Sequence, residues 1–233
     1  MINIRRSEDR GRTKLDWLDS RHSFSFGDYY DEKNINFGKL IVFNEDYIEP
    51  KSGFGKHYHE NAEIITIVLE GTLTHGDSIG NKGTIKAGEV QRMSAGTGIM
   101  HSEYNYSKEK VHLLQVWLEP KDKDIDPSYE QKQINLLNVE NKLIEVASNK
   151  RNNGSLFIYQ DAIFLFGNLE SESNHIFKLR QTHGLYFFVI KGSIELNGLI
   201  IKNGDAAEIS RIKEISFKVI DASKVLLIDI PLN

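Results

Sequence analysis

The sequence predicts an all-β protein made of two successive strand-rich halves. Short apolar runs alternate with turns of glycine and asparagine, a pattern typical of sandwiches and barrels and not of alternating strands and helices. The two halves also resemble each other: Val68-Leu-Glu-Gly71 matches Val189-Ile-Lys-Gly192, and Ile85-Lys-Ala-Gly88 matches Ile201-Lys-Asn-Gly204. A duplicated barrel is the simplest explanation of this internal similarity.

The predicted strands are short apolar segments that stop at turn residues. They span residues 39–43, 64–69, 111–118, 163–166, 185–190 and 225–230. Their close spacing leaves little room for helices between them, which supports the barrel interpretation.

A polar segment over residues 121–127 separates the two halves and contains a proline. Because such a composition is typical of connections, we interpret residues 121–150 as a linker. One short helix is expected in it, within residues 129–147. We therefore expect a first barrel over residues 1–120 and a second barrel over residues 151–233.

The composition excludes several classes of function. A net charge of −4 over 233 residues, with both signs interspersed, offers no basic face for nucleic acid. The absence of cysteine removes disulfides, thiolate metal ligands and cysteine nucleophiles. No apolar stretch approaches the roughly 20 residues of a membrane helix, and no signal segment opens the chain. We expect a cytoplasmic protein that binds neither nucleic acid nor membranes.

Two pairs of candidate ligands stand out in the first half. His57 and His59 are two residues apart, and so are His101 and Glu103. Residues two apart on a strand point to the same side, so two adjacent strands would aim three imidazoles and a carboxylate into one cavity. This set of nitrogen and oxygen donors is typical of a transition-metal site.

The second half lacks these ligands. The internal alignment places Lys178 opposite His57, Arg180 opposite His59, Phe217 opposite His101 and Val219 opposite Glu103. None of these side chains suits a divalent cation, so we expect the second barrel to be metal-free and to stabilise the first by covering its edge strands.

The remaining candidates have structural interpretations. We expect His22 to be a hydrogen-bonded packing residue, His75 to be exposed beside a turn, and His112 to be half-buried on a strand. The aromatic residues near the N-terminus are interpreted as core and not as a substrate platform: Phe24, Phe26, Tyr29 and Tyr30.

Motifs in the first half resemble the first cupin domain of the pirin family. The resemblance rests on His57-Tyr-His59-Glu-Asn-Ala-Glu63, on Leu69-Glu-Gly71 and on Gly88-Glu-Val-Gln-Arg-Met93 followed by His101-Ser-Glu103. The opening segment also resembles that of the family, through Trp17, His22-Ser-Phe24-Ser-Phe26-Gly27 and Tyr29-Tyr30-Asp31. The resemblance implies two tandem cupin barrels of the jelly-roll type, the second degenerate, with few short helices.

The pirin resemblance implies one metal ion held by His57, His59, His101 and Glu103. Ordinary cupins instead place the carboxylate ligand shortly after the first histidine pair, which would be Glu63. We favour Glu103 because it shares a strand face with His101. Glu63 would then orient a ligating imidazole or accept a proton near the substrate. Glu103 and Glu63 are therefore the candidate catalytic residues.

The resemblance implies a divalent transition metal, with iron favoured over copper, manganese, nickel, cobalt or zinc. It further implies a quercetin 2,3-dioxygenase-like enzyme that opens a flavonol ring with dioxygen. A flavonol needs a dry apolar pocket, and Phe54, Met93, Ile99 and Met100 flank the ligands in sequence. The alternative is a non-catalytic, metal-dependent regulatory module with a protein partner.

Overall fold

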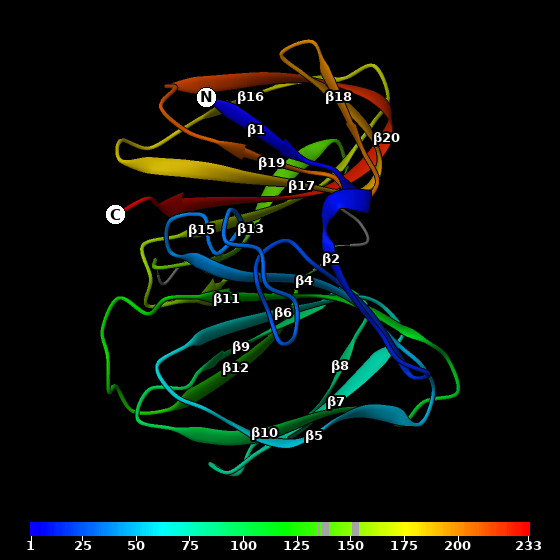
Figure 1. The fold of residues 1–233 in the computed structure, drawn as a ribbon, viewed down its shortest axis with the longest axis vertical. Helices are drawn as coiled ribbons and strands as arrows, with labels where there is room; N and C mark the ends of the chain where they lie inside the picture. Colours follow the sequence, from blue (N-terminus) through cyan, green and yellow to red (C-terminus); the bar gives the residue numbers. More distant parts are fainter. Residues whose placement is uncertain (135, 137–139, 151–153) are drawn as a thin grey trace.

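The computed structural model describes residues 1–134, 136, 140–150 and 154–233. The chain forms two β-barrels stacked on one another, as Figure 1 shows. This confirms the predicted all-β duplicated architecture. Within the described residues, no helix is long and apolar enough to cross a membrane.

The first barrel is built from a seven-stranded and a four-stranded sheet. The larger sheet contains β2 (Gly11–Lys14), β3 (Leu18–His22), β4 (Leu40–Ile48), β6 (Glu63–Glu70), β9 (Glu89–Ser94), β11 (Val111–Leu118) and β12 (Ser128–Gln133), in the order β12-β9-β6-β11-β4-β3-β2. The smaller sheet contains β5 (Ser52–His59), β7 (Thr72–Asp77), β8 (Lys82–Lys86) and β10 (Ile99–Asn105), in the order β5-β10-β7-β8.

The second barrel is one nine-stranded sheet. Its strands are β1 (Ile2–Arg5), β13 (Lys142–Ser148), β14 (Leu156–Phe157), β15 (Ile163–Leu169), β16 (Asn174–Lys178), β17 (His183–Leu196), β18 (Leu199–Lys202), β19 (Ala206–Ile209) and β20 (Glu214–Pro231). The main order is β1-β19-β17-β20-β15-β13-β14, with β16 on β20 and β18 on β17. A 3-10 turn, η1 (Ser7–Asp9), follows β1.

All six predicted strands are present, most of them longer than predicted. The expected short helix within residues 129–147 falls partly on residues 135 and 137–139, which lie outside the described ones, and it stays a prediction. On either side of them, residues 129–133 belong to β12 and residues 142–147 to β13. β12 pairs with β9, so its hydrogen bonds are satisfied by the first barrel. Pairing with a sheet edge therefore overrode the local polar composition.

Strand pairing also crosses the expected domain boundaries, which stay predictions. β1, at the N-terminus, pairs with β19 of the second barrel, as the dark blue strand at the top of Figure 1 shows. The N-terminal segment therefore contributes β1 to the second barrel before the chain enters the first barrel at β2.

One apolar core joins the two barrels. Phe43 of the first barrel contacts Tyr186 and Phe188 of the second, with ring centroids 4.8 and 4.7 Å apart. The same cluster contains Ile65 and Val116, which alternate along their strands with residues facing the first barrel's interior. The large sheet of the first barrel is therefore buried on both faces, because the second barrel covers its outer side.

Candidate metal centre

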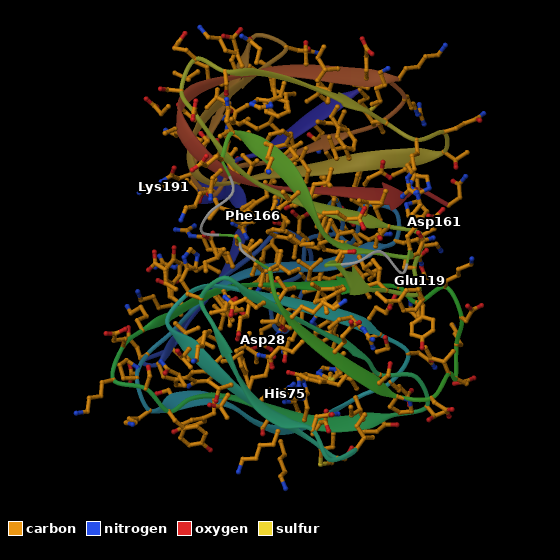
Figure 2. All side chains as sticks on the ribbon, turned by 180° about the vertical axis from the view of Figure 1, so that it is seen from behind. Asp28, His75, Glu119, Asp161, Phe166 and Lys191 are labelled. Atoms are coloured by element: carbon orange, nitrogen blue, oxygen red, sulfur yellow. The ribbon has the colours of Figure 1, made fainter. Side chains whose placement is uncertain are left out.

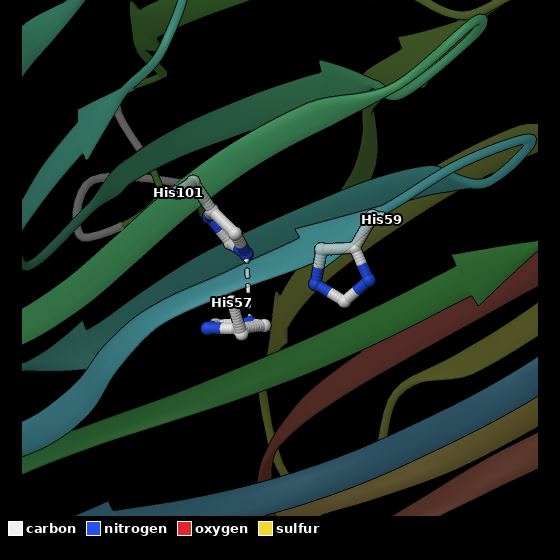
Figure 3. A group of neighbouring side chains, drawn as sticks. All are labelled: His57, His59 and His101. Carbon is white, nitrogen blue, oxygen red and sulfur yellow. Dashed lines mark hydrogen bonds between the residues drawn. The ribbon is translucent and has the colours of Figure 1, made fainter.

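The three predicted histidine ligands lie together in the small sheet of the first barrel. His57 and His59 share one face of β5, and His101 lies on the neighbouring strand β10, directly opposite His57 in the register. Their neighbours Tyr58 and Met100 alternate to the outside and are exposed. Figure 3 shows the three rings converging from these two strands.

The ring nitrogens of the three histidines point at one another. Nε2 of His57 lies 3.0 Å from Nε2 of His101. Nδ1 of His57 donates to the carbonyl oxygen of Gly55 at 2.8 Å, which leaves a lone pair on Nε2. Nε2 of His59 is buried and has no hydrogen-bond partner. One donor atom from each residue lies within 4.8 Å of the other two.

Electrostatics keep the rings of His59 and His101 neutral at physiological pH. Burial, reinforced by the neighbouring imidazoles, lowers the pKa of His59 to about 4 and that of His101 to about 3. A neutral imidazole has a free lone pair, whereas an imidazolium cannot ligate a metal. Nε2 of His101 donates its proton to Nε2 of His57. A cation that displaces this proton would face one nitrogen donor from each of the three rings, so the donor set fits a divalent transition metal.

Glu103 lies in the barrel interior on the same face of β10 as His101 and is 1% exposed. Its carboxylate accepts from Nε2 of Gln91 at 2.6 Å and from Nε2 of Gln115 at 2.7 Å. Its donor oxygen falls into a second cluster, with His101 and His75, and not into the triad of His57 and His59. The carboxylate is thus beside the centre and held in place by two amides, and its role as a ligand stays a proposal.

A cavity of about 550 Å³ opens beside the histidines. His57, His59 and Glu103 line it together with the aromatic side chains Trp17, Phe26, Phe54 and Trp117. Trp117 packs edge-on against His59, with centroids 4.7 Å apart. The site therefore combines candidate ligands with an apolar, aromatic enclosure large enough for a multi-ring compound.

Asp46, on β4, is a second carboxyl group lining this cavity. Its side chain is buried and accepts a hydrogen bond from Ser20. Burial raises the pKa of Asp46 to about 7, with the Ser20 hydrogen bond opposing the shift and the negative charge of Glu103 adding to it. This group therefore exchanges a proton in the physiological range. Sequence reasoning did not single it out.

Glu63 does not face the cavity, contrary to expectation. It lies an odd number of residues before the interior residue Thr66 on β6, so its side chain points to the opposite face. There it accepts backbone N–H groups of Tyr159 and Gln160, both at 2.7 Å. Burial raises the pKa of Glu63, while these hydrogen bonds oppose the shift. Glu63 joins the two barrels and is placed to act neither as ligand nor as base.

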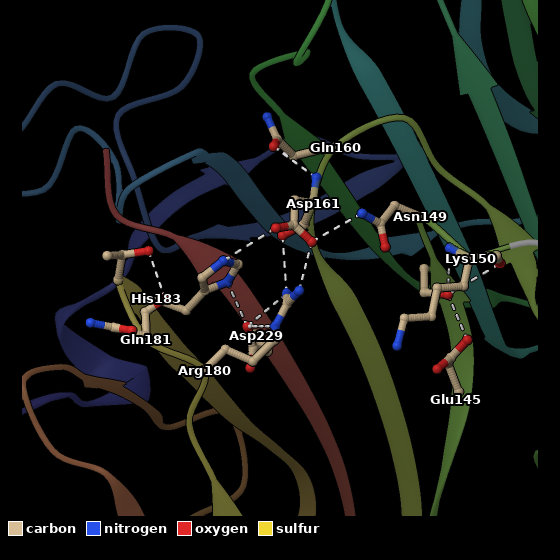
Figure 4. A network of polar contacts seen from close by, with 11 residues as sticks. Glu145, Asn149, Lys150, Gln160, Asp161, Arg180, Gln181, His183 and Asp229 are labelled. Carbon is tan, nitrogen blue, oxygen red and sulfur yellow. Dashed lines mark hydrogen bonds and ion pairs between the residues drawn. The ribbon is translucent and has the colours of Figure 1, made fainter.

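A network of ion pairs in the second barrel begins at the residue after Gln160. Asp161, next to Gln160, pairs with Arg180 at 2.6 Å, and Arg180 also pairs with Asp229 at 2.9 Å. His183 lies 2.7 Å from the same Asp229, as Figure 4 shows. Arg180, which the internal alignment placed opposite His59, is therefore engaged in ion pairs.

The expectation that His75 is exposed was wrong, because its side chain is 0% exposed. Figure 2 shows it inside the lower barrel. His75 shares the buried face of β7 with Leu73, and its ring stacks on that of Tyr129 with centroids 4.6 Å apart. His22 is hydrogen-bonded to Asn44 at 2.8 Å, and His112 is buried beside Glu45, both in agreement with packing roles.

Several cavity residues were missed at the sequence level. Of the four apolar residues proposed as lining, Phe54 contributes, whereas Met93 and Ile99 belong to a separate core cluster and Met100 is exposed. Alternation along β11 could have found Gln115 and Trp117, because they occupy the opposite face to Leu114 and Val116. Among the N-terminal aromatics, Phe24 is core and Tyr30 is exposed, but Phe26 lines the cavity.

Comparison with family models matches both halves of the chain. The model described as "Pirin" matches residues 4–118. The model described as "Quercetinase C-terminal cupin domain" matches residues 145–230. The two matches therefore cover both barrels.

Individual proteins are similar over the whole chain. A quercetin 2,3-dioxygenase of Escherichia coli K12 is 40% identical over 232 residues, which covers 99% of both chains. A pirin-like protein of Caulobacter vibrioides is 36% identical over 98% of this chain and 99% of its own. The crystal structure of the bacterial pirin YhhW of Escherichia coli in complex with nickel(II) superposes with a TM-score of 0.94 at 40% identity, covering 99% of both chains.

Proposed function

The chain belongs to the pirin family, and from this premise we propose that it is a metal-dependent flavonol dioxygenase acting as a quercetin 2,3-dioxygenase. In that reaction both atoms of dioxygen enter the product. Two carbon–carbon bonds of the central ring break, and the carbon between them leaves as carbon monoxide. The name of the similar Escherichia coli protein supports this substrate class.

The observation that carries the proposal is the aromatic cavity beside the histidines. A flavonol is a flat aromatic compound with hydroxyl groups at its edges. The cavity offers aromatic surface for its rings through Trp17, Phe26, Phe54 and Trp117, and His57 and His59 line the same cavity. This combination of apolar walls and a few convergent polar groups is typical of a small-molecule site.

We propose that His57, His59 and His101 hold one divalent ion, with Glu103 as the fourth ligand and iron as the predicted ion. The nickel(II) complex of the similar bacterial pirin supports a divalent ion of this class. When bound, the ion would act as a Lewis acid towards a deprotonated hydroxyl of the substrate.

Asp46 is the group best placed to take the hydroxyl proton. Both oxygens of Glu103 already accept amide hydrogen bonds, whereas Asp46 lines the cavity with one hydrogen bond, from Ser20. A base whose pKa lies near the working pH removes a proton and returns it efficiently. The indole rings of Trp17 and Trp117 line the cavity, and their apolar surface would keep water away from the reactive deprotonated substrate.

The test is flavonol-dependent oxygen uptake by protein reconstituted with Fe(II). We expect quercetin to be consumed together with dioxygen, with carbon monoxide released, and His101→Ala to lose this activity. His175→Gln is the matched control, because His175 lies in the second barrel and packs against Phe217. Metal-loaded protein without oxygen uptake would favour the regulatory alternative.

A further inference from the structure

A second cluster of ligand atoms lies deeper in the first barrel. It contains His75 of β7 together with His101 and Glu103 of β10, and one donor atom from each lies within 4.8 Å of the other two. All three residues are buried, and His75 is 0% exposed. Their backbones are held together because His75 pairs directly with Glu103 across the two strands.

His75 is prepared as a ligand by its surroundings. Its Nε2 lies 3.0 Å from Oδ2 of Asp77. Asp77 also accepts the backbone N–H groups of Ile79 and Asn81, at 3.1 and 2.9 Å, which stabilise it as a carboxylate. The proton of His75 therefore lies on Nε2, towards Asp77. This is the carboxylate–histidine arrangement that orients metal ligands.

The opposite nitrogen of His75 has no partner. Its Nδ1 is buried without a hydrogen bond, and so is Nδ1 of His101. A buried polar atom without a partner is costly, unless a ligand binds it. The ring of His75 cannot turn freely, since it stacks on Tyr129 with centroids 4.6 Å apart and planes at 20°. The free lone pair is consequently fixed in direction.

We propose that His75, His101 and Glu103 form an inner binding position for a divalent transition metal, alternative to the outer position at His57 and His59. The inner set is two imidazoles and one carboxylate, a combination that holds Fe(II) in non-haem oxygenases. His101 and Glu103 are common to both positions, so one ion occupies either the outer or the inner position. The proposal deepens the proposed function and rests on the same centre.

The two positions differ in chemistry. Because Glu103 is common to both, the outer position offers three imidazoles beside this carboxylate, whereas the inner position offers two imidazoles and the support of Asp77 behind His75. The carboxylate is therefore a larger share of the inner ligand set. An ion with greater preference for oxygen ligands, such as Fe(II) or Mn(II), is therefore drawn inward relative to Ni(II) or Cu(II).

The test separates the positions by removing the outer one. In the variant His57→Ala/His59→Ala, we expect Co(II) titration to show about one ion per chain, weaker than in the wild type. Adding His75→Phe, which keeps a ring on Tyr129, should weaken that binding at least tenfold. Equal Co(II) binding with and without His75→Phe, or none in the double variant, would overturn the inner position.

A second measurement covers a failure of the triple variant to fold. Anomalous scattering from crystals of the Co(II)-loaded double variant should place the ion about 2.1 Å from Nδ1 of His75. An ion bound elsewhere contradicts the proposal. Wild-type protein that binds metal and oxidises flavonols while the double variant binds none would refute the inner position alone. Wild-type protein that binds no metal would refute the proposed function itself.

Discussion

At the scale of residues, the spacing of ligands along strands predicted the histidines of the centre but not their full environment. His57, His59 and His101 converge because residues two apart on a strand share one face, and this face points into the barrel on both β5 and β10. The direction of Glu63 could not be predicted, because residues 60–62 separate β5 from β6 and interrupt the alternation of side chains. Asp46 could not be found, since its importance comes from a cavity formed by distant strands.

Asp46 should make the stability of the metal-free protein pH-dependent. Folding raises its pKa to about 7 from an unfolded value near 3.9, so the fold favours the protonated form. Its contribution to stability is therefore full below about pH 4 and is lost as pH rises through about 7. A rise in the pKa of this size corresponds to roughly 4 kcal/mol in the free energy of unfolding.

Urea unfolding between about pH 5 and pH 8 measures this effect. Asp46→Asn cannot ionise, so its free energy of unfolding should fall less steeply across this range than that of the wild type. Identical pH slopes for the two proteins would show that Asp46 does not titrate in this window.

At the scale of elements, the positions of the strands follow the apolar pattern of the sequence. The secondary structure of the polar segment after Leu118 depends instead on pairing with the edge of a sheet that is distant in sequence. β12 forms because β9 leaves backbone groups for it to pair with, and no local pattern shows this. The glycine turns could be predicted from the sequence. The structure shows that glycine is required for two different reasons: at some turns φ is positive, and at others a neighbouring chain segment leaves no room for a Cβ.

Gly96 precedes β10 and its turn sets the strand that carries His101. Its φ is +49°, and a Cβ there would lie 1.9 Å from the carbonyl oxygen of Ile125. We expect Gly96→Ala to lower the free energy of unfolding by more than about 2 kcal/mol, because the clash involves backbone. Gly80→Ala is the control, since Gly80 has φ of +98° with nothing within 4 Å. Thermal unfolding measures the difference, and an equal decrease in melting temperature for the two variants would show that the close contact at Gly96 does not matter.

Glu63 joins two elements from different barrels, β6 and the segment before β15. In Glu63→Gln an amide NH₂ replaces one acceptor facing a backbone N–H, which leaves a buried donor unpaired. We expect a loss of about 2 kcal/mol in the free energy of unfolding. Glu60→Gln, at an exposed position nearby, is the matched control and should change stability little. Equal melting temperatures for the wild type and Glu63→Gln would argue against the contact.

At the scale of the whole molecule, the duplication was visible in the sequence, but the depth of contact between the barrels was not. The shared core, the Glu63 contact and the exchange of β1 all cross from one barrel to the other. Repeated hairpin motifs indicate that two barrels exist. They cannot indicate which faces meet, because that depends on apolar residues from many strands.

Removing residues 150–233 should therefore produce insoluble or metal-poor protein. The deletion exposes Phe43 and the outer face of the large sheet, and it leaves β1 without its partner. Large exposed apolar faces and unpaired strand edges favour aggregation. Solubility and elemental analysis of the truncated chain test this, and a soluble truncation with full metal content would be inconsistent with it.

Metal content per chain is the measurement that tests the central claim most directly. Elemental analysis of untagged wild-type protein should give about one divalent transition-metal ion per chain, and His101→Ala should give close to none, since His101 belongs to every ligand set at this centre. His175→Gln should retain the wild-type content. Wild-type protein that stays free of metal after reconstitution, or a His101→Ala variant with undiminished content, would contradict the assignment of this cluster as a metal centre.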